Sequence, residues 1–151
     1  MQVSEILEQK EGRIVSAKKD ASFTMLAELL RNEAIGAVII FSGSNGLAGI
    51  VSERDLVWAI ANHGEEAFQL AAGDLMSSSV ITCGRDSSIS DIMKQMLENQ
   101  VRHLPVVEDD SVIGMISVND AILAAHGELR WMAKALRHQV VLQAGWATEE
   151  Q

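Results

Sequence analysis

A repeat of about 65 residues constrains the fold of this 151-residue chain more than any other feature. Residues 49–55 read Gly-Ile-Val-Ser-Glu-Arg-Asp, and residues 114–120 read Gly-Met-Ile-Ser-Val-Asn-Asp, which is the same pattern 65 positions later. Two further pairs of segments match at a displacement of 66 positions: residues 20–23 with 86–89, and residues 35–40 with 101–106. A duplicated unit of this length usually cannot bury its apolar face alone, so the copies are expected to pack on each other. We therefore expect a functional site at the seam between them.

Composition narrows the class of protein. Hydrophobic residues make up 48% of the chain, which is enough for a sizeable core. The net charge of −9 argues against a nucleic-acid partner, because such surfaces neutralise phosphates with clustered Lys and Arg. The longest apolar run, residues 34–41, is far shorter than the roughly 20 residues that span a membrane, and Cys83 has no partner for an internal disulfide. We expect a globular protein of the cytoplasm, with no membrane or nucleic-acid partner.

Each copy shows the same order of predicted elements. Apolar residues at positions 89, 92, 93, 96 and 97 have the spacing of a helix with one buried face, and residues 22–32 are their counterpart in the first copy. Apolar, β-branched runs on either side of a turn predict two hairpins, residues 37–41 with 47–51 and residues 104–107 with 112–116. Short strands are predicted before the first helix of each copy, near residues 14–16 and 80–83.

A second helix follows each hairpin. Ser52 and Ser117 are suited to cap the starts of these helices, and Gly64 and Gly127 are suited to end them. The elements predict an α+β fold with α/β-like character, in which two β-α-β-β-α repeats pack with pseudo-twofold symmetry through their sheets. The expected division is a first repeat at residues 1–64, a structured connector at 65–73, a second repeat at 74–127, and a helix and tail at 128–151.

The predicted C-terminal helix, residues 128–141, has an apolar stripe formed by Leu129, Met132, Leu136 and Val140. This stripe either folds back over its own domain or pairs with a second chain. The second alternative is favoured, because the repeats already have helices enough to cover their sheets. The tail from residue 145 is expected to be frayed.

The order of elements, the doubled Gly-hydrophobic-hydrophobic-Ser-x-x-Asp motif and residues 101–107 (Val-Arg-His-Leu-Pro-Val-Val) resemble a tandem pair of CBS domains, the regulatory modules named after cystathionine beta-synthase. The resemblance covers about residues 3–127. It implies a module whose two clefts bind an adenine nucleotide or related adenosyl compound, such as AMP, ADP, ATP or a dinucleotide like NAD(H), as a regulatory ligand. It also implies a homodimer that transmits occupancy to dimer or partner geometry, without catalysis and without a required cofactor. The competing interpretation is a constitutive protein-interaction module with vestigial clefts.

The repeated motif has two physical interpretations. Ser52 and Ser117 stand at helix starts, where free N–H groups and the helix dipole favour ligand oxygens. Asp55 and Asp120, three residues on, can accept hydrogen bonds from both hydroxyls of a ribose, which is the role that the family resemblance implies for them. The alternative is a variant of the capping box, in which these side chains satisfy only their own helix starts. Duplication copies a cap as faithfully as a binding site, so the second occurrence does not decide between them.

The copies differ in the basic residues available for a phosphate. Arg102 and His103 lead into the second hairpin, and the resemblance implies that basic side chains there contact phosphate. Arg is better suited because its planar fork binds phosphate bidentately, whereas His is only partly charged near neutral pH. The alternatives for Arg102 are a solvated charge or an ion pair with Glu98. The other candidates are Arg54, which stands where the second copy has Asn119, and the Lys18–Lys19 pair, which is interpreted as surface.

The resemblance further implies that small and aliphatic segments hold an adenine ring, although the residues alone indicate core strands. Gly49 and Gly114 allow close approach of backbone or ligand. Pro105 is the sole proline and stands where the first copy has Ile39, which predicts an edge or kinked strand. The candidate adenine-binding residues are Ser16, Ala17, Ile35, Gly36, Ala37, Val38, Thr82, Cys83 and Pro105.

Catalytic and metal-binding patterns are not found. His63, His103, His126 and His138 lack metal-type spacing, and neither a Gly-x-Ser-x-Gly elbow nor a Gly-rich phosphate loop with Lys occurs. Cys83, close to Arg85 in sequence, is either a redox sensor or buried filler, and filler is favoured. We expect no enzymatic activity and no metal.

Overall fold

The structure is a computed structural model that describes residues 1–11 and 13–146, with side chains as far as residue 136. The first copy contains β1 (Ser16–Lys18), α2 (Phe23–Asn32), β2 (Ala37–Ser42), β3 (Gly46–Ser52) and α3 (Glu53–His63). The second copy contains α5 (Ile89–Asn99), β4 (His103–Glu108), β5 (Ser111–Ser117) and α6 (Val118–Trp146). Helix α1 (Val3–Gln9) precedes the first copy, and the 3-10 helix η1 (Gly64–Gln69) and α4 (Ala72–Leu75) connect the two. The connector is therefore structured, as expected.

Two small sheets, one in each copy, confirm the predicted hairpins and the α+β class. In the first sheet the order is β1-β2-β3, with β1 parallel and β3 antiparallel to β2, whereas β4 and β5 form an antiparallel pair. Both hairpins have a register irregularity at the same place in the repeat, after Ile40 and after Val106. Asp109 and Asp110 have φ of 48° and 60°, the positive values that both central residues of a type I′ turn require.

The predicted strand at residues 80–83 is not formed. Within this segment Cys83 makes a single parallel bridge to β4. In the first copy the N–H of Ile39 donates to the carbonyl of Val15 at 3.3 Å. Pro105 occupies the equivalent position of β4 and has no N–H to donate, so the matching hydrogen bond is lost. One side of β4 is thus only partly covered, in agreement with the edge position expected at Pro105.

Each copy has its own hydrophobic core, and each core is completed by the helix that precedes the other copy in sequence. Val3 and Ile6 of α1 are buried in the core of the second copy. Ala72 of α4 is buried in the core of the first copy. Lys10 and Met76, the C-cap residues of these helices, lie 66 positions apart, which is the displacement of the repeat. This reciprocal exchange fixes the two copies relative to each other.

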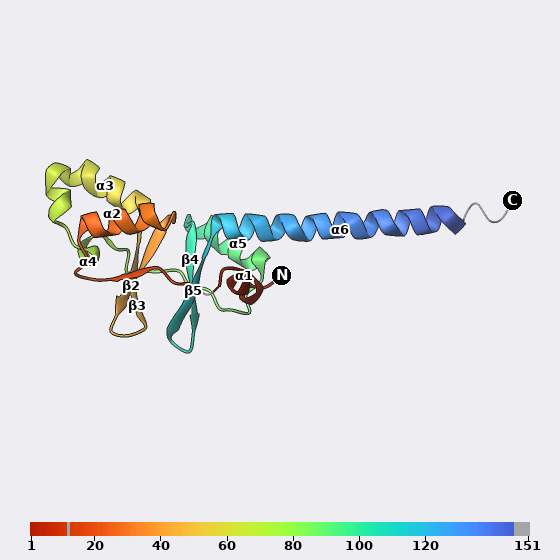
Figure 1. Cartoon of the computed structure of the whole chain (residues 1–151), viewed down its shortest axis with the longest axis horizontal. Coiled ribbons are helices and arrows are strands. Elements are labelled where there is room, and N and C mark those ends of the chain that lie inside the picture. The colour runs from red at the N-terminus through yellow and green to blue at the C-terminus, as the bar shows by residue number, and fades with distance from the viewer. Residues whose placement is uncertain (12, 147–151) are drawn as a thin grey trace.

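The copies also contact each other through their sheets. β3 lies against β5, and the N–H of Val112 donates to the carbonyl of Asn45 at 3.4 Å. Figure 1 shows the two hairpins side by side, with their turns on the same side of the molecule. The packing through the sheets therefore follows the expected arrangement.

The second helices of the two copies end differently. α3 ends at His63, and Gly64 has a positive φ of 58°, as predicted. Gly127 does not end a helix, because α6 runs through it to Trp146 and projects away from both copies (Figure 1). Leu129 and Leu136 on the projecting part are 65% and 62% exposed, so this helix does not fold back over its own domain. The side chain of Val140 and the tail beyond residue 146 lie outside the described residues.

Candidate functional site

A cleft of about 310 Å³ lies between the two copies. Its first wall is the start of α3, which carries the motif of the first copy. Its second wall belongs to the second copy and consists of the segment before α5 and the start of β4. Six sequence-predicted residues meet in this cleft: Gly36, Ser52, Arg54, Asp55, Arg102 and His103. A cleft therefore lies at the seam, where the repeat leads us to expect a functional site.

The Ser52–Asp55 pair forms a complete capping box. The N–H and the hydroxyl of Ser52 donate to Oδ2 of Asp55 at 2.7 and 3.0 Å, and the N–H of Asp55 donates to Oγ of Ser52 at 3.3 Å. Both hydrogen bonds to the carboxylate end on Oδ2, so Oδ1 has no hydrogen-bond partner among the described residues. The capping interpretation is therefore correct for this motif, but it leaves an oxygen of a half-buried carboxylate available to a ligand in the cleft.

Basic and aromatic side chains line the rest of the cleft. The guanidinium carbon of Arg54 lies 5.7 Å from the centre of the Trp58 ring, within cation–π distance. Arg102 is exposed and makes no ion pair within the described chain, and Glu98 pairs with Lys94 instead at 3.8 Å. A phosphate group entering the cleft would thus meet two guanidinium groups that no carboxylate neutralises directly.

Trp58 was not predicted from the sequence. It lies three residues after Asp55, which places both side chains on one face of α3, and this spacing was an available signal. Its ring is 57% exposed and provides a flat surface on which a base can stack. Ile81, from a segment expected to hold the adenine ring, also lines the cleft. The other lining residues that sequence reasoning missed are Ile50, Glu53, Ser77, Ser79, Val80, Gln100 and Val101.

His103 lies at the contact between the copies. A Cβ placed on Gly36 would be 2.8 Å from the His103 ring, so a larger residue at position 36 would have to displace this ring. Burial lowers the pKa of His103, and the nearby Glu53 and Asp120 carboxylates oppose this shift only in part. His103 is therefore mainly a neutral hydrogen-bonding group at neutral pH, and the positive charge of the cleft comes from arginine.

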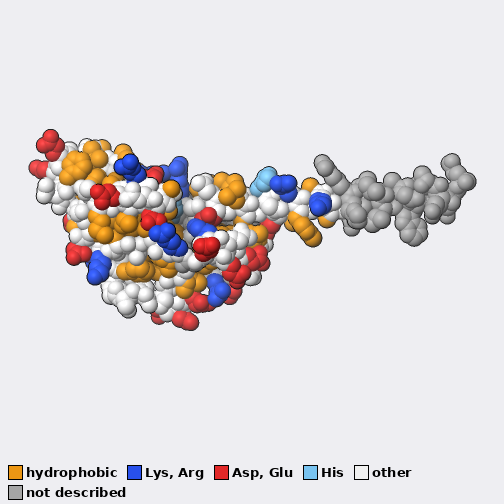
Figure 2. All heavy atoms as spheres, viewed as in Figure 1, with side chains coloured by type: hydrophobic (Ala, Val, Ile, Leu, Met, Phe, Trp, Pro, Cys, Tyr) orange, Lys and Arg blue, Asp and Glu red, His pale blue; other side chains and the backbone are white. Residues whose placement is uncertain are grey.

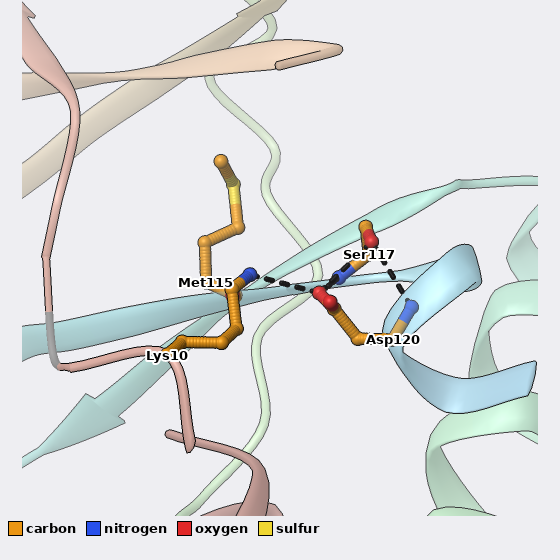
Figure 3. A network of polar contacts seen from close by, with 4 residues as sticks. All are labelled: Lys10, Met115, Ser117 and Asp120. Carbon is orange, nitrogen blue, oxygen red and sulfur yellow. Dashed lines mark hydrogen bonds and ion pairs between the residues drawn. The ribbon is translucent and has the colours of Figure 1, made fainter. Parts of the chain in front are cut away.

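The motif of the second copy is differently occupied. Ser117 and Asp120 form the same box, with the Ser117 N–H and hydroxyl donating to Oδ2 of Asp120 at 2.8 and 2.9 Å. Oδ2 also accepts from the Nζ of Lys10 at 2.8 Å, and Nζ donates to the carbonyl of Met115 at 3.0 Å (Figure 3). Burial raises the pKa of Asp120, but the hydrogen bonds from Lys10 and Ser117 outweigh it, so the pKa lies below its ordinary value. Asn119 is exposed beside this network.

The remaining predicted residues do not join the Asp55 cleft. Ser16 and Ala17 line a separate cavity of about 390 Å³ that also includes Lys18. Gly49 and Gly114 allow close approach of other residues of the chain rather than of a ligand. A Cβ on Gly49 would contact Met76, and a Cβ on Gly114 would contact Leu7. Ser117, Asn119 and Asp120 line neither cavity. The same holds for the other adenine candidates, Ile35, Ala37, Val38, Thr82, Cys83 and Pro105, most of which are core residues.

Cys83 is buried filler. Burial raises the pKa of its thiol to about 11, and Arg85 pairs with Glu108 rather than with this sulfur. The redox interpretation is therefore wrong. Across the described residues, no group of three or more His, Cys, Asp or Glu side chains is arranged to hold a metal ion, and no helix there has the length and apolarity to cross a membrane.

Two repeats of one α+β unit, with a cleft at their seam, define a tandem-repeat module. The family profile of the CBS domain matches residues 3–62 and 72–127. This chain belongs to the CBS domain family. Proteins built on pairs of this domain are generally regulatory rather than catalytic.

Curated relatives match the chain over part of their own length. A mitochondrial CBS domain-containing protein of Arabidopsis thaliana is 32% identical over 100 residues, which cover 64% of this chain and 48% of that protein. An uncharacterized protein of Methanopyrus kandleri is 29% identical over 110 residues, covering 72% of this chain and 56% of that protein. The chain thus spans about half the length of these relatives.

Solved structures show the same fold. A CBS-domain containing protein from Agrobacterium tumefaciens is 31% identical, with a TM-score of 0.80 over 83% of this chain and 99% of that one. A CBS domain pair solved in complex with 5′-methylthioadenosine and S-adenosyl-L-methionine is 22% identical, with a TM-score of 0.76 over 85% of this chain and 98% of that one. The second likeness concerns the fold alone.

Proposed function

We propose that this chain is a regulatory ligand-sensing module that binds an adenine nucleotide or a related adenosyl compound in the cleft between its two CBS domains. The observation that carries the proposal is the meeting of Asp55 from one copy with Arg102 and His103 from the other. A free carboxylate oxygen suits ribose hydroxyls, and uncompensated guanidinium groups suit phosphates. The domain pair solved with adenosyl compounds supports the ligand class.

The shape of the cleft supports the same class of ligand. Its volume of about 310 Å³ lies at the lower end of small-molecule sites, which typically measure about 300–1,000 Å³. Trp58, Ile81 and Val101 provide apolar and aromatic surface for a flat base. A mononucleotide such as AMP fits these dimensions better than a dinucleotide such as NAD(H).

The test is a titration of the full chain with AMP, ADP, ATP, NAD(H), 5′-methylthioadenosine and S-adenosylmethionine, followed by calorimetry and by thermal unfolding. A bound compound at a hundredfold its Kd is expected to stabilise the folded state by about 2.7 kcal/mol. GMP is the control for adenine preference. Absence of binding by every adenine compound would refute the proposal and favour a constitutive interaction module.

We further propose that the module acts as a homodimer that changes geometry with occupancy. Apolar side chains remain exposed on the projecting part of α6, including Trp131 at 71% and Met132 at 53%, and Figure 2 shows hydrophobic and basic groups on this arm. Helices of neighbouring chains can cover such residues. Light scattering of the full chain with and without AMP tests this assembly, and a concentration-independent monomer would refute it.

A further inference from the structure

The two motifs of the repeat face different chemical surroundings. Asp55 makes no ion pair within the described residues. In both motifs the hydrogen bonds to the carboxylate end on Oδ2, so the motifs differ in charge rather than in the number of available oxygens. Asp120 is held by an ammonium group from its own chain, because Nζ of Lys10 lies 2.8 Å from Oδ2. The side chain of Asp120 is 20% exposed and that of Lys10 is 40% exposed, so this contact is partly shielded from water.

The ammonium group is supplied from a defined place in the repeat. Lys10 is the C-cap of α1 and corresponds to Met76, the C-cap of α4, at the displacement of 66 positions. The sulfur of Met76 packs against Gly49, and this uncharged side chain cannot form an ion pair with Asp55. One difference between the copies, Met76 near the first motif and Lys10 at the second, therefore separates the unpaired carboxylate from the ion-paired one.

α1 holds Lys10 in place through contacts that do not involve the carboxylate. Val3 and Ile6 are buried in the core of the second copy, and Leu7 packs against Gly114 of β5. The N–H groups of Val3 and Ser4 donate to the carbonyls of Ser87 and Arg85 at 3.0 and 2.9 Å. Nζ makes a second fixed contact, with the carbonyl of Met115 at 3.0 Å (Figure 3). The lysine is thus anchored at both ends.

We propose that Lys10 is a built-in occupant of the second motif, which reserves ligand exchange for the Asp55 cleft and limits the chain to one adenine ligand. This assignment rests on the proposed function. Lys10 neutralises the charge of the Asp120 carboxylate, so a ribose hydroxyl there makes a weaker hydrogen bond than at an unpaired carboxylate, which weakens binding by about tenfold. At AMP concentrations near the Kd of the Asp55 cleft, the Asp120 motif is therefore filled in only about a tenth of the chains.

The decisive variant is Lys10→Met, because it gives the second motif the residue that the first one has. Isothermal titration with AMP and, separately, with adenosine is expected to give one binding event per chain for the wild type and two for the variant. The added event is expected to disappear in Lys10→Met/Asp120→Ala and to persist in Lys10→Met/Asp55→Ala. Lys10→Arg retains the cation and is the matched control, with one event.

The outcomes distinguish this assignment from the proposed function. One event in both the wild type and Lys10→Met overturns the assignment and leaves the proposed function intact. Two AMP events in the wild type, with one lost in Lys10→Met while adenosine binding is unchanged, identify Lys10 as a phosphate contact and also overturn it. No binding of AMP or adenosine to either protein refutes the proposed function together with the assignment. Circular dichroism of each variant checks that it is folded.

Discussion

Replacing Asp55 with Ala separates the two roles of this carboxylate, the helix cap and the ribose contact. The change removes the acceptor of the Ser52 N–H and hydroxyl, at 2.7 and 3.0 Å. Loss of such a cap costs about 1 kcal/mol, within a range of about 0.5–2 kcal/mol. In a chain of this size, each kcal/mol corresponds to about 2–4 °C in Tm. Without ligand, Asp55→Ala is therefore expected to unfold a few degrees below the wild type.

A third Ser-x-x-Asp cap, outside the two repeated motifs, provides the matched control. At the start of α5, Oγ of Ser88 donates to Oδ2 of Asp91 at 2.7 Å and accepts from the N–H of Asp91 at 3.1 Å. Neither residue lines either of the two cavities. Asp91→Ala thus removes a carboxylate that accepts from the N-cap serine hydroxyl at the same helix position, while leaving the cleft intact. The Ser88 N–H does not donate to Asp91, so this variant controls for the side-chain part of the cap.

The two variants are expected to differ once AMP is present. At a hundredfold the wild-type Kd, AMP should stabilise the wild type and Asp91→Ala by about 2.7 kcal/mol, or about 5–11 °C. If the carboxylate contributes about 1.5–3 kcal/mol to the ribose contact, the gain in Asp55→Ala falls to about 0.3–1.3 kcal/mol at the same AMP concentration. Differential scanning calorimetry measures these shifts. An undiminished AMP shift in Asp55→Ala would show that the carboxylate is a cap only, and would refute the ribose contact.

Three further predictions concern the core, the seam and the thiol. Gly49→Ala should destabilise the fold by about 1–3 kcal/mol in urea unfolding, because its Cβ would lie 2.7 Å from the Ser77 carbonyl oxygen. Gly127→Ala is the control: a Cβ there has nothing within 4 Å, so the change should be neutral or stabilising by up to about 1 kcal/mol. Burial lowers the pKa of His103, so its contribution to stability is complete above the unfolded pKa of 6.5 and is lost as pH falls through the folded value. The urea midpoint should therefore drop between pH 7.5 and 5.5, and His103→Gln should reduce that drop; an unchanged slope would contradict the burial of the ring. Burial and a pKa of about 11 should make Cys83 slow toward a thiol reagent at pH 8 until urea unfolds the chain, whereas fast labelling of the native protein would contradict its place in the core.

The sequence was sufficient for the elements whose signals are local. The helices at residues 22–32 and 89–99 have stripes of period 3.6, and the hairpins have β-branched runs around turn residues, so each is visible within about ten positions. Gly127 was misleading because a glycine costs a helix interior only about 1 kcal/mol, which neighbouring Ala and Leu residues with high helix propensity outweigh. The predicted strand at residues 80–83 does not form because its partner, β4, has no N–H at Pro105. This residue lies more than 20 positions away in the sequence.

The parts of the site that escaped prediction depend on contacts between distant residues. Lys10 and Asp120 are 110 positions apart, and no periodic pattern relates them. The packing of α1 on the second copy rather than the first also depends on tertiary contacts, through Val3 and Ile6. The repeat alone gives part of this information, because aligning Lys10 with Met76 identifies a position near the two motifs at which the copies differ in charge.

The divergence of the two copies also determines what a bound ligand can move. Lys10 and Asp120 both belong to structure that packs on the second copy, so their ion pair does not span the seam. A ligand in the Asp55 cleft contacts residues of both copies and therefore shifts their relative arrangement only as far as it prefers one arrangement over the other. The carbonyl of Arg102 accepts from the N–H of Val118, the first residue of α6, at 2.8 Å. Because the same residue faces the cleft with its guanidinium group and holds the start of α6 with its main chain, we expect a phosphate drawn to Arg102 to act directly on the helix that projects from the module.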